Sequence, residues 1–158
     1  MWVLIRAVVY SSLFIGLLLV FLPARVLSWS GISTMPTLGA WQVCGLIVAG
    51  TGAAIALWCI LAFATLGEGT PLPLDPPRRL VVRGPYRFVR NPMYVGAVLV
   101  LAGAALVHQS IGLLCYTALF GLVMHGFVVI YEEPTLQQSF GSDYQAYCGQ
   151  VGRWLPKL

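Results

Sequence analysis

The stretch from Arg78 to Gly96 reads RRLVVRGPYRFVRNPMYVG and forms a basic island between long apolar segments. It holds five of the nine lysines and arginines of the chain, namely Arg78, Arg79, Arg83, Arg87 and Arg90. Its second half predicts the start of a helix at Asn91 and Pro92, because asparagine is a favoured N-cap and proline suits the first helical turn. Free N–H groups at a helix start beside guanidinium groups predict a site for anions.

This basic stretch has two interpretations. In a membrane protein, arginines next to apolar segments can serve only to fix the orientation of the chain. Here Tyr86 and Tyr94 alternate with the arginines, and the pairs Gly84-Pro85 and Asn91-Pro92 impose defined turns. Because an electrostatic anchor requires neither feature, the pattern favours a binding site.

The composition indicates an integral membrane protein. Of 158 residues, 59% are hydrophobic and 9% are charged, whereas a soluble domain carries about 25% charged residues. The length indicates one domain, residues 1–158, and the net charge of +4 is not spread over a broad basic face, so nucleic acid is not an expected partner. The four cysteines form no C-x-x-C motif and are expected to be small apolar residues rather than metal ligands.

Hydropathy and turn residues predict an all-α fold with about four transmembrane helices. The first helix is expected to end at Pro23 and to be followed by a loop from Ala24 to Trp41. The last two helices form a hairpin that turns at His108-Gln109-Ser110, and the first of them has about 15 residues, fewer than the roughly 20 of a full crossing. The expected spans are Val3–Leu22, Val43–Leu66, Asn91–Val107 and Ile111–Tyr131.

Small residues on the second span predict close packing against another helix. These residues are Gly45, Ala49, Gly50, Gly52, Ala53 and Ala56. Residues 1–66 are thus expected to hold the first two helices, and residues 67–158 a polar loop, the hairpin and a C-terminal helix.

The C-terminal helix is predicted to be short and amphipathic. Pro134 is expected to end the preceding helix and to open this one, and Gly141 to bend it. Its apolar face, on the membrane surface or over the basic stretch, comprises Leu136, Phe140, Tyr144 and Tyr147. The segment Arg153-Trp154-Leu155-Pro156 is expected to be an interfacial anchor.

Four crossings place both termini and the basic stretch on one side of the membrane. The positive-inside rule makes this side the cytoplasm, with Arg25 as the one basic residue on the far side. The protein is therefore expected in the inner membrane, if it is bacterial, with its polar site facing the cytoplasm.

Two carboxylates follow the last span. Glu132 and Glu133 are expected beside the basic stretch, since the hairpin brings its two ends together. Charged residues at a membrane boundary suggest a zwitterionic ligand, while the alternative is an Arg–Glu pairing that closes the hairpin. His125 lies seven residues before Glu132 on the same helix face, and it either packs between helices or lines a ligand cavity.

Taken in order, these motifs resemble a known superfamily. The segments Gly84-Pro85-Tyr86, Arg90 to Gly96 (RNPMYVG) and Glu132-Glu133-Pro134, followed by Phe140-Gly141, Tyr144 and Tyr147, resemble the isoprenylcysteine carboxyl methyltransferases and phospholipid methyltransferases. The resemblance covers roughly residues 67–156. It implies an integral membrane enzyme that uses S-adenosylmethionine without a Rossmann domain, and the chain has no G-x-G-x-x-G motif after a strand.

The resemblance also implies which residues form the site. Arg90 and Glu133 are the candidate catalytic residues, and Glu133 is the candidate base for an amine acceptor. Asn91 stands where histidine is common in the superfamily, and Val128 stands where eukaryotic carboxyl methyltransferases place an arginine implicated in substrate binding. The implied cofactor contacts are Arg78, Arg79, Leu80, Val81, Tyr86, Asn91, Pro92, Met93, Tyr94 and Glu132.

The predicted function is therefore methyl transfer from S-adenosylmethionine to a lipophilic acceptor, either an isoprenylcysteine carboxylate-like compound or a lipid amine. Membrane lipids are expected partners, and neither a metal nor nucleic acid is expected. Two alternatives are a membrane protein like the NADPH-dependent sterol reductases and a non-catalytic membrane protein that binds anionic lipid.

Overall fold

The computed structural model describes residues 15–32, 37–66 and 80–157, and the regular structure within them is helical. The all-α prediction is confirmed for this part of the chain, in which an isolated bridge also pairs Val89 with Gly152. The elements are η1 (Ile15–Phe21), α2 (Leu22–Trp29), α3 (Ala40–Leu66), η2 (Gly84–Arg87), α4 (Pro92–His108), α5 (Ile111–Phe127), η3 (Val128–Glu132) and α6 (Glu133–Gln150).

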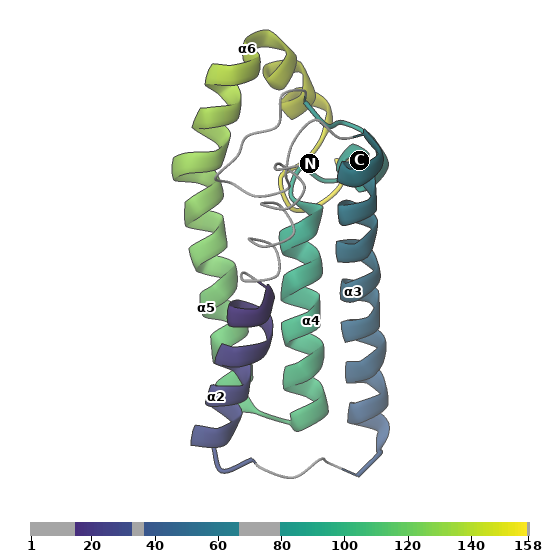
Figure 1. Ribbon diagram of the computed structural model, residues 1–158, viewed down its shortest axis with the longest axis vertical. Helices are drawn as coiled ribbons and strands as arrows, with labels where there is room; N and C mark the ends of the chain where they lie inside the picture. The colour runs from purple at the N-terminus through teal and green to yellow at the C-terminus, as the bar shows by residue number, and fades with distance from the viewer. Residues whose placement is uncertain (1–14, 33–36, 67–79, 158) are drawn as a thin grey trace.

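Helices α3, α4 and α5 lie side by side, each antiparallel to the next, and α2 lies against α5 (Figure 1). Helix α6 continues from α5 through η3 and bends over the end of the molecule where α4 begins (Figure 1). The start of α4 and the end of α5 are therefore at the same end of the molecule, as the predicted hairpin requires.

Two helical stretches in the described residues are long and apolar enough to cross a membrane. They are Ala40–Ala62 and the continuous stretch Ile111–Gln150, which begins with α5. Two shorter stretches, Gly16–Trp29 and Pro92–His108, are also apolar. The total of four crossings thus stays a prediction.

The prediction that the first span ends at Pro23 is wrong. The helix continues through Pro23 to Trp29, so the segment expected to be a loop begins as helix. Pro23 lies at the second position of α2, directly after the π-helical turn η1. A π-helical turn is wider than a regular α-helical turn and leaves room for the proline ring, which is why the helix tolerates Pro23.

Pro134 does not interrupt the helix either. Glu133 keeps helical angles (φ −63°, ψ −44°), so the expected break before Pro134 is absent. This proline also follows a π-helical turn, Val128–Glu132, and the wider turn gives the ring room where a regular α-helix would clash. The bend lies instead at Gly141, as predicted, where the backbone is non-helical (φ 51°, ψ −121°).

Helices α3 and α4 approach closely along a seam of small residues. A Cβ atom added at Gly52 would lie 2.5 Å from the carbonyl oxygen of Gly96, and one at Gly103 would lie 2.5 Å from that of Gly45. Close packing of the second span is therefore confirmed, but its partner contributes glycines of its own. Gly50, expected in the same surface, has no atom within 4 Å of an added Cβ and is exposed, as is Ala53.

The predicted turn between α4 and α5 is confirmed. Gln109 adopts the left-handed conformation (φ 48°, ψ 41°) that ends α4, and the Ser110 hydroxyl accepts a hydrogen bond from the Leu113 N–H at 3.2 Å to cap α5. Leu101 of α4 and Phe120 of α5 are buried in one core cluster, against which Leu18 packs. The hairpin is therefore held by its turn and by its core.

The α3–α4 seam predicts a position-specific loss of stability. Gly52→Leu should lower the melting temperature in detergent by about 5 °C or more, because overpacking costs about 1–3 kcal/mol. Gly50→Leu, two residues away on the same helix, should leave it within about 2 °C. Equal shifts for the two variants, measured by circular dichroism, would contradict the seam.

Candidate functional site

One carboxylate and two guanidinium groups form an ion cluster above the hairpin. Glu133 Oε1 lies 3.0 Å from Arg90 Nη1. The same carboxylate accepts two hydrogen bonds from Arg153, at 2.7 Å from Nε to Oε1 and at 2.9 Å from Nη2 to Oε2. This bidentate hydrogen bond raises the pKa of Arg153, and both oxygens of Glu133 are engaged.

Arg90 also contacts α6. Its Nη1 atom lies 2.8 Å from Cys148 Sγ and 3.4 Å from the Tyr144 hydroxyl. Its Nε atom is buried and has no hydrogen-bond partner in the part of the chain that the structure describes. A guanidinium with one buried, unused N–H retains capacity to bind an anionic group.

The C-terminal segment runs back along the basic stretch. The Arg90 N–H donates to the Gly152 carbonyl oxygen at 2.8 Å, and Asn91 Nδ2 donates to the Arg153 carbonyl oxygen at 3.3 Å. Asn91 does occupy the N-cap position of α4, but its side chain makes no capping hydrogen bond, so that part of the prediction is wrong. The side chain is buried and bonded to the C-terminal segment, which draws it away from the helix end.

Tyr94 and Glu132 meet across the hairpin. The Tyr94 hydroxyl donates to Glu132 Oε2 at 3.1 Å, linking the first turn of α4 to the end of η3. Pro92, at the first position of α4, is fully buried. The sequence-based expectation that the two ends of the hairpin share one polar site agrees with this contact.

Tyr86 joins the basic stretch to both α3 and α6. Its carbonyl oxygen accepts a hydrogen bond from the Tyr147 hydroxyl at 2.6 Å, and its phenol pairs with Cys59 of α3. Burial, followed by the proximity of Cys59, raises the pKa of Tyr86 well above its ordinary value. The group therefore acts as a neutral phenol in this site.

The apolar face predicted for the C-terminal helix gathers in one cluster over the basic stretch. Tyr144, Tyr147 and Val151 are buried in it. The residues packed against them are Leu80, Leu136, Phe140 and Cys148. Leu80 thus lies beside the site. Two other predicted cofactor contacts, Val81 and Met93, are half-buried. Arg78 and Arg79 fall outside the described residues.

An apolar cavity of about 260 Å³ lies between α4 and α5. The residues that line it are Tyr94, Val95, Val98, Gly121, Met124, His125 and Trp154. Trp154 Nε1 donates to His125 Nδ1 at 3.0 Å, and the Trp154 ring lies 6.5 Å from that of Tyr94. Of the two interpretations of His125, the structure supports the one in which it lines a cavity.

Sequence reasoning missed two residues of this site. Arg153 and Trp154 are assigned above to an interfacial anchor, whereas the structure folds Arg153 onto Glu133 and Trp154 onto the cavity. The available signal was the pair of adjacent carboxylates at a membrane boundary, because such charges require cationic partners. Within the described residues, no group of three or more His, Cys, Asp or Glu side chains could hold a metal ion.

The fold and the site together define the class of this protein. It is a helical protein with exposed apolar helices, and its hairpin carries a charged cluster at one end with an apolar cavity beside it. The chain belongs to the phospholipid methyltransferase family, whose model matches residues 40–143. This confirms the resemblance found in the sequence.

A curated relative is the cobalt-zinc-cadmium resistance protein CzcN of Cupriavidus metallidurans. It is 26% identical over 130 residues, which cover 82% of this chain and 54% of the relative. The chain therefore spans about half the length of that protein. No solved structure matches the chain.

The ion cluster predicts a specific loss of stability. Glu133→Gln should lower the free energy of unfolding by about 2 kcal/mol, because it leaves two half-buried guanidinium groups without their anion. The control is Asp143→Asn, at an exposed acidic residue of the same helix, which should change it by less than about 0.5 kcal/mol. Denaturant titration in detergent measures both, and similar values would contradict the ion cluster.

Proposed function

We propose that this protein is an integral membrane methyltransferase that transfers a methyl group from S-adenosylmethionine to a lipophilic acceptor. The observation that carries the proposal is the Tyr94–Glu132 hydrogen bond, which joins the two ends of the hairpin beside Arg90 and next to the apolar cavity. Membership of the phospholipid methyltransferase family supports the reaction type.

The residues present fit the cofactor's chemistry. Arg90, through its unused Nε, would hold the carboxylate of the cofactor. Glu132 would accept hydrogen bonds from its amino or hydroxyl groups, and the ring of Tyr94 would face the positive charge. Glu133 would act by fixing Arg90, since its oxygens are already bonded. When bound, S-adenosylmethionine supplies a methyl group attached to a positively charged sulfur.

The remaining cofactor contacts are assigned in the same proposal. Leu80, Val81 and Tyr86 would line the cofactor from the basic stretch, and Asn91, Pro92 and Met93 from the start of α4. Arg78 and Arg79 keep this assignment from the resemblance alone. The chain's task is to align the reacting groups and to exclude water, so no covalent nucleophile is required.

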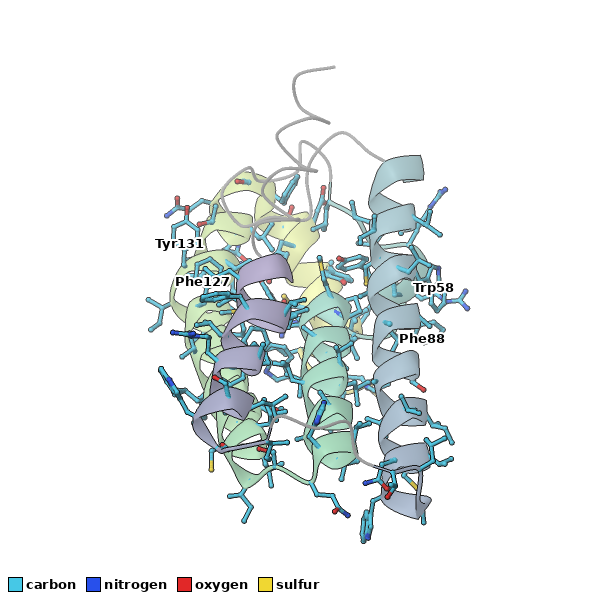
Figure 2. The ribbon with its side chains drawn as sticks, turned by 60° about the horizontal axis from the view of Figure 1, so that its bottom comes forward. Trp58, Phe88, Phe127 and Tyr131 are labelled. Carbon is cyan, nitrogen blue, oxygen red and sulfur yellow. The ribbon has the colours of Figure 1, made fainter. Side chains whose placement is uncertain are left out.

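The outer surface of the helices favours a membrane environment. Large apolar side chains of α3 such as Ile47, Leu57 and Leu61 are exposed. Two aromatic pairs lie on opposite flanks of the molecule, Trp58 with Phe88 and Phe127 with Tyr131 (Figure 2). Aromatic side chains are enriched at the membrane–water interface, so we place the boundary near these pairs.

We therefore retain four transmembrane helices in the proposal, with α6 at the membrane surface. The site end carries Arg83, Arg87 and Arg90, while the far end carries Arg25, so the site faces the cytoplasm. In a bacterium the membrane would be the inner one.

The contacts of the site favour an acceptor that has already lost its proton, such as a carboxylate. An ammonium acceptor must first lose a proton, but both oxygens of Glu133 and one oxygen of Glu132 are bonded. A carboxylate acceptor requires no base. Its oxygen would receive the methyl group directly, and the electron pair of the broken carbon–sulfur bond would stay on sulfur.

Cofactor binding tests the proposal. Calorimetric titration with S-adenosylhomocysteine should show binding that Glu132→Ala weakens at least about tenfold, the loss of roughly one charged hydrogen bond. His108→Ala, at the opposite end of α4, is the control and should bind as the unaltered protein does. Binding of NADPH instead would support a protein like the sterol reductases. Binding of neither ligand would support a non-catalytic membrane protein that binds anionic lipid.

The product distinguishes the two acceptor classes. After transfer from methyl-labelled S-adenosylmethionine to extracted membrane lipids, mild alkali should release the label as methanol, because a methyl ester is hydrolysed under these conditions. An N-methyl product keeps its label. Label that stays non-volatile after the alkali treatment would contradict the carboxylate acceptor while leaving methyl transfer intact.

A further inference from the structure

The outer flank of α3 carries a group of arginine and apolar side chains that the charged site does not use. Phe88 and Trp58 meet edge to face on this flank, with ring centroids 6.3 Å apart (Figure 2). The Arg87 guanidinium lies over the Phe88 ring, 4.5 Å from its centroid. Arg83 stands at the other end of the same turn, directly before η2. We call these four residues, together with Val82, the η2 patch.

The side chains of the η2 patch reach the surface of the molecule. Trp58 is 47% exposed, and Phe88 and Val82 are each 43% exposed. Both arginines are exposed as well. Large apolar groups beside cations suit a membrane–water interface, because the apolar groups enter the lipid while the guanidinium groups reach the headgroups. The η2 patch thus lies where the membrane boundary is proposed above.

The two guanidinium groups of the η2 patch have no counter-charge in the described part of the chain. The ion pairs there are those of Glu133 with Arg90 and Arg153, and neither Arg83 nor Arg87 takes part in them. A phosphate group presents oxygen pairs that match the planar fork of a guanidinium. The η2 patch is therefore complementary to an anion that is held next to hydrocarbon.

The turn that presents these arginines packs against α3. Pro85, inside η2, is buried. Gly84 has a φ of 62°, and a Cβ added to it would lie 3.4 Å from the Cβ of Ala62. A proline with a fixed φ beside a glycine in the left-handed region defines the path of the backbone. The two arginines are thus placed before a ligand arrives, which lowers the cost of binding it.

Resting on the membrane boundary proposed above but not on methyl transfer, we propose that the η2 patch binds an anionic phospholipid of the surrounding membrane. Arg83 and Arg87 hold the phosphate of its headgroup, while Phe88 and Trp58 lie against the upper part of its chains. A headgroup that also carries an ammonium group binds more weakly, because that cation offsets the phosphate. The lipid is a resident partner on the α3 flank and is distinct from the methyl acceptor.

Lipid titration of the full chain in a nonionic detergent tests this proposal. Dioctanoyl phosphatidylglycerol is added while the melting temperature is followed, and its rise gives an apparent dissociation constant. This lipid should bind at least about tenfold more tightly than dioctanoyl phosphatidylcholine. Arg83→Gln and Arg87→Gln should each weaken its binding about fivefold, as expected for about 1 kcal/mol per arginine.

The matched control is Arg25→Gln. Arg25 is also exposed and also lies over an aromatic ring, that of Phe21 at 5.9 Å, but it belongs to α2 at the far end of the molecule. Its substitution should leave the affinity for phosphatidylglycerol within about twofold. Equal affinities for the two lipids, or equal losses for Arg25→Gln and Arg87→Gln, overturn the proposal.

Two further measurements separate the alternatives. Inorganic phosphate should not raise the melting temperature as phosphatidylglycerol does, and an equal rise overturns the lipid as the occupant. Binding of S-adenosylhomocysteine is measured in the same samples. Normal binding without a preference for the anionic lipid overturns the η2 patch alone, whereas the lipid preference without S-adenosylhomocysteine binding supports the η2 patch and counts against the proposed function alone.

Discussion

The carboxylate of Glu133 holds three parts of the chain together. It binds Arg90, directly before α4, and Arg153, after the end of α6, while it belongs to the first turn of α6 itself. Removing such charges from water is costly, and the geometry compensates for it because both carboxylate oxygens receive guanidinium donors. The C-terminal segment is thereby positioned so that Asn91 and Trp154 find their partners.

The position of Glu133 depends in turn on an irregular helix. The π-helical turn η3 lets the helix pass Pro134 without a break. The side chains of Glu132 and Glu133 therefore project from one continuous helix at the junction of η3 and α6. One of them, Glu132, turns to Tyr94, and the other to the two arginines. On the opposite side of α4, the glycine seam with α3 sets how close the hairpin lies to the rest of the molecule. Local irregularities thus place the polar groups, and regular helices support them.

The site separates two kinds of chemistry. Charged and hydrogen-bonding groups gather at the helix ends, where Arg90 and Glu132 would bind a polar donor molecule. Below them lies an apolar cavity between α4 and α5, suited to a lipophilic acceptor. Tyr94 contacts both regions, so the reacting groups would meet at this residue. In the proposed reaction, such an arrangement would keep water away from the methyl group while leaving a route to lipid.

The amino-acid sequence by itself determined the all-α class, the hairpin with its turn at Gln109 and the bend at Gly141, because hydropathy and turn residues act locally along the chain. It also determined the meeting of Tyr94 with Glu132, because a hairpin brings its two ends together. It also carried the family motifs. Only the tertiary structure decided that helices pass through Pro23 and Pro134, since a π-helical turn leaves no pattern in sequence. The roles of Arg153 and Trp154 were likewise decided there, because contacts between residues distant along the chain depend on how α6 folds back over α4.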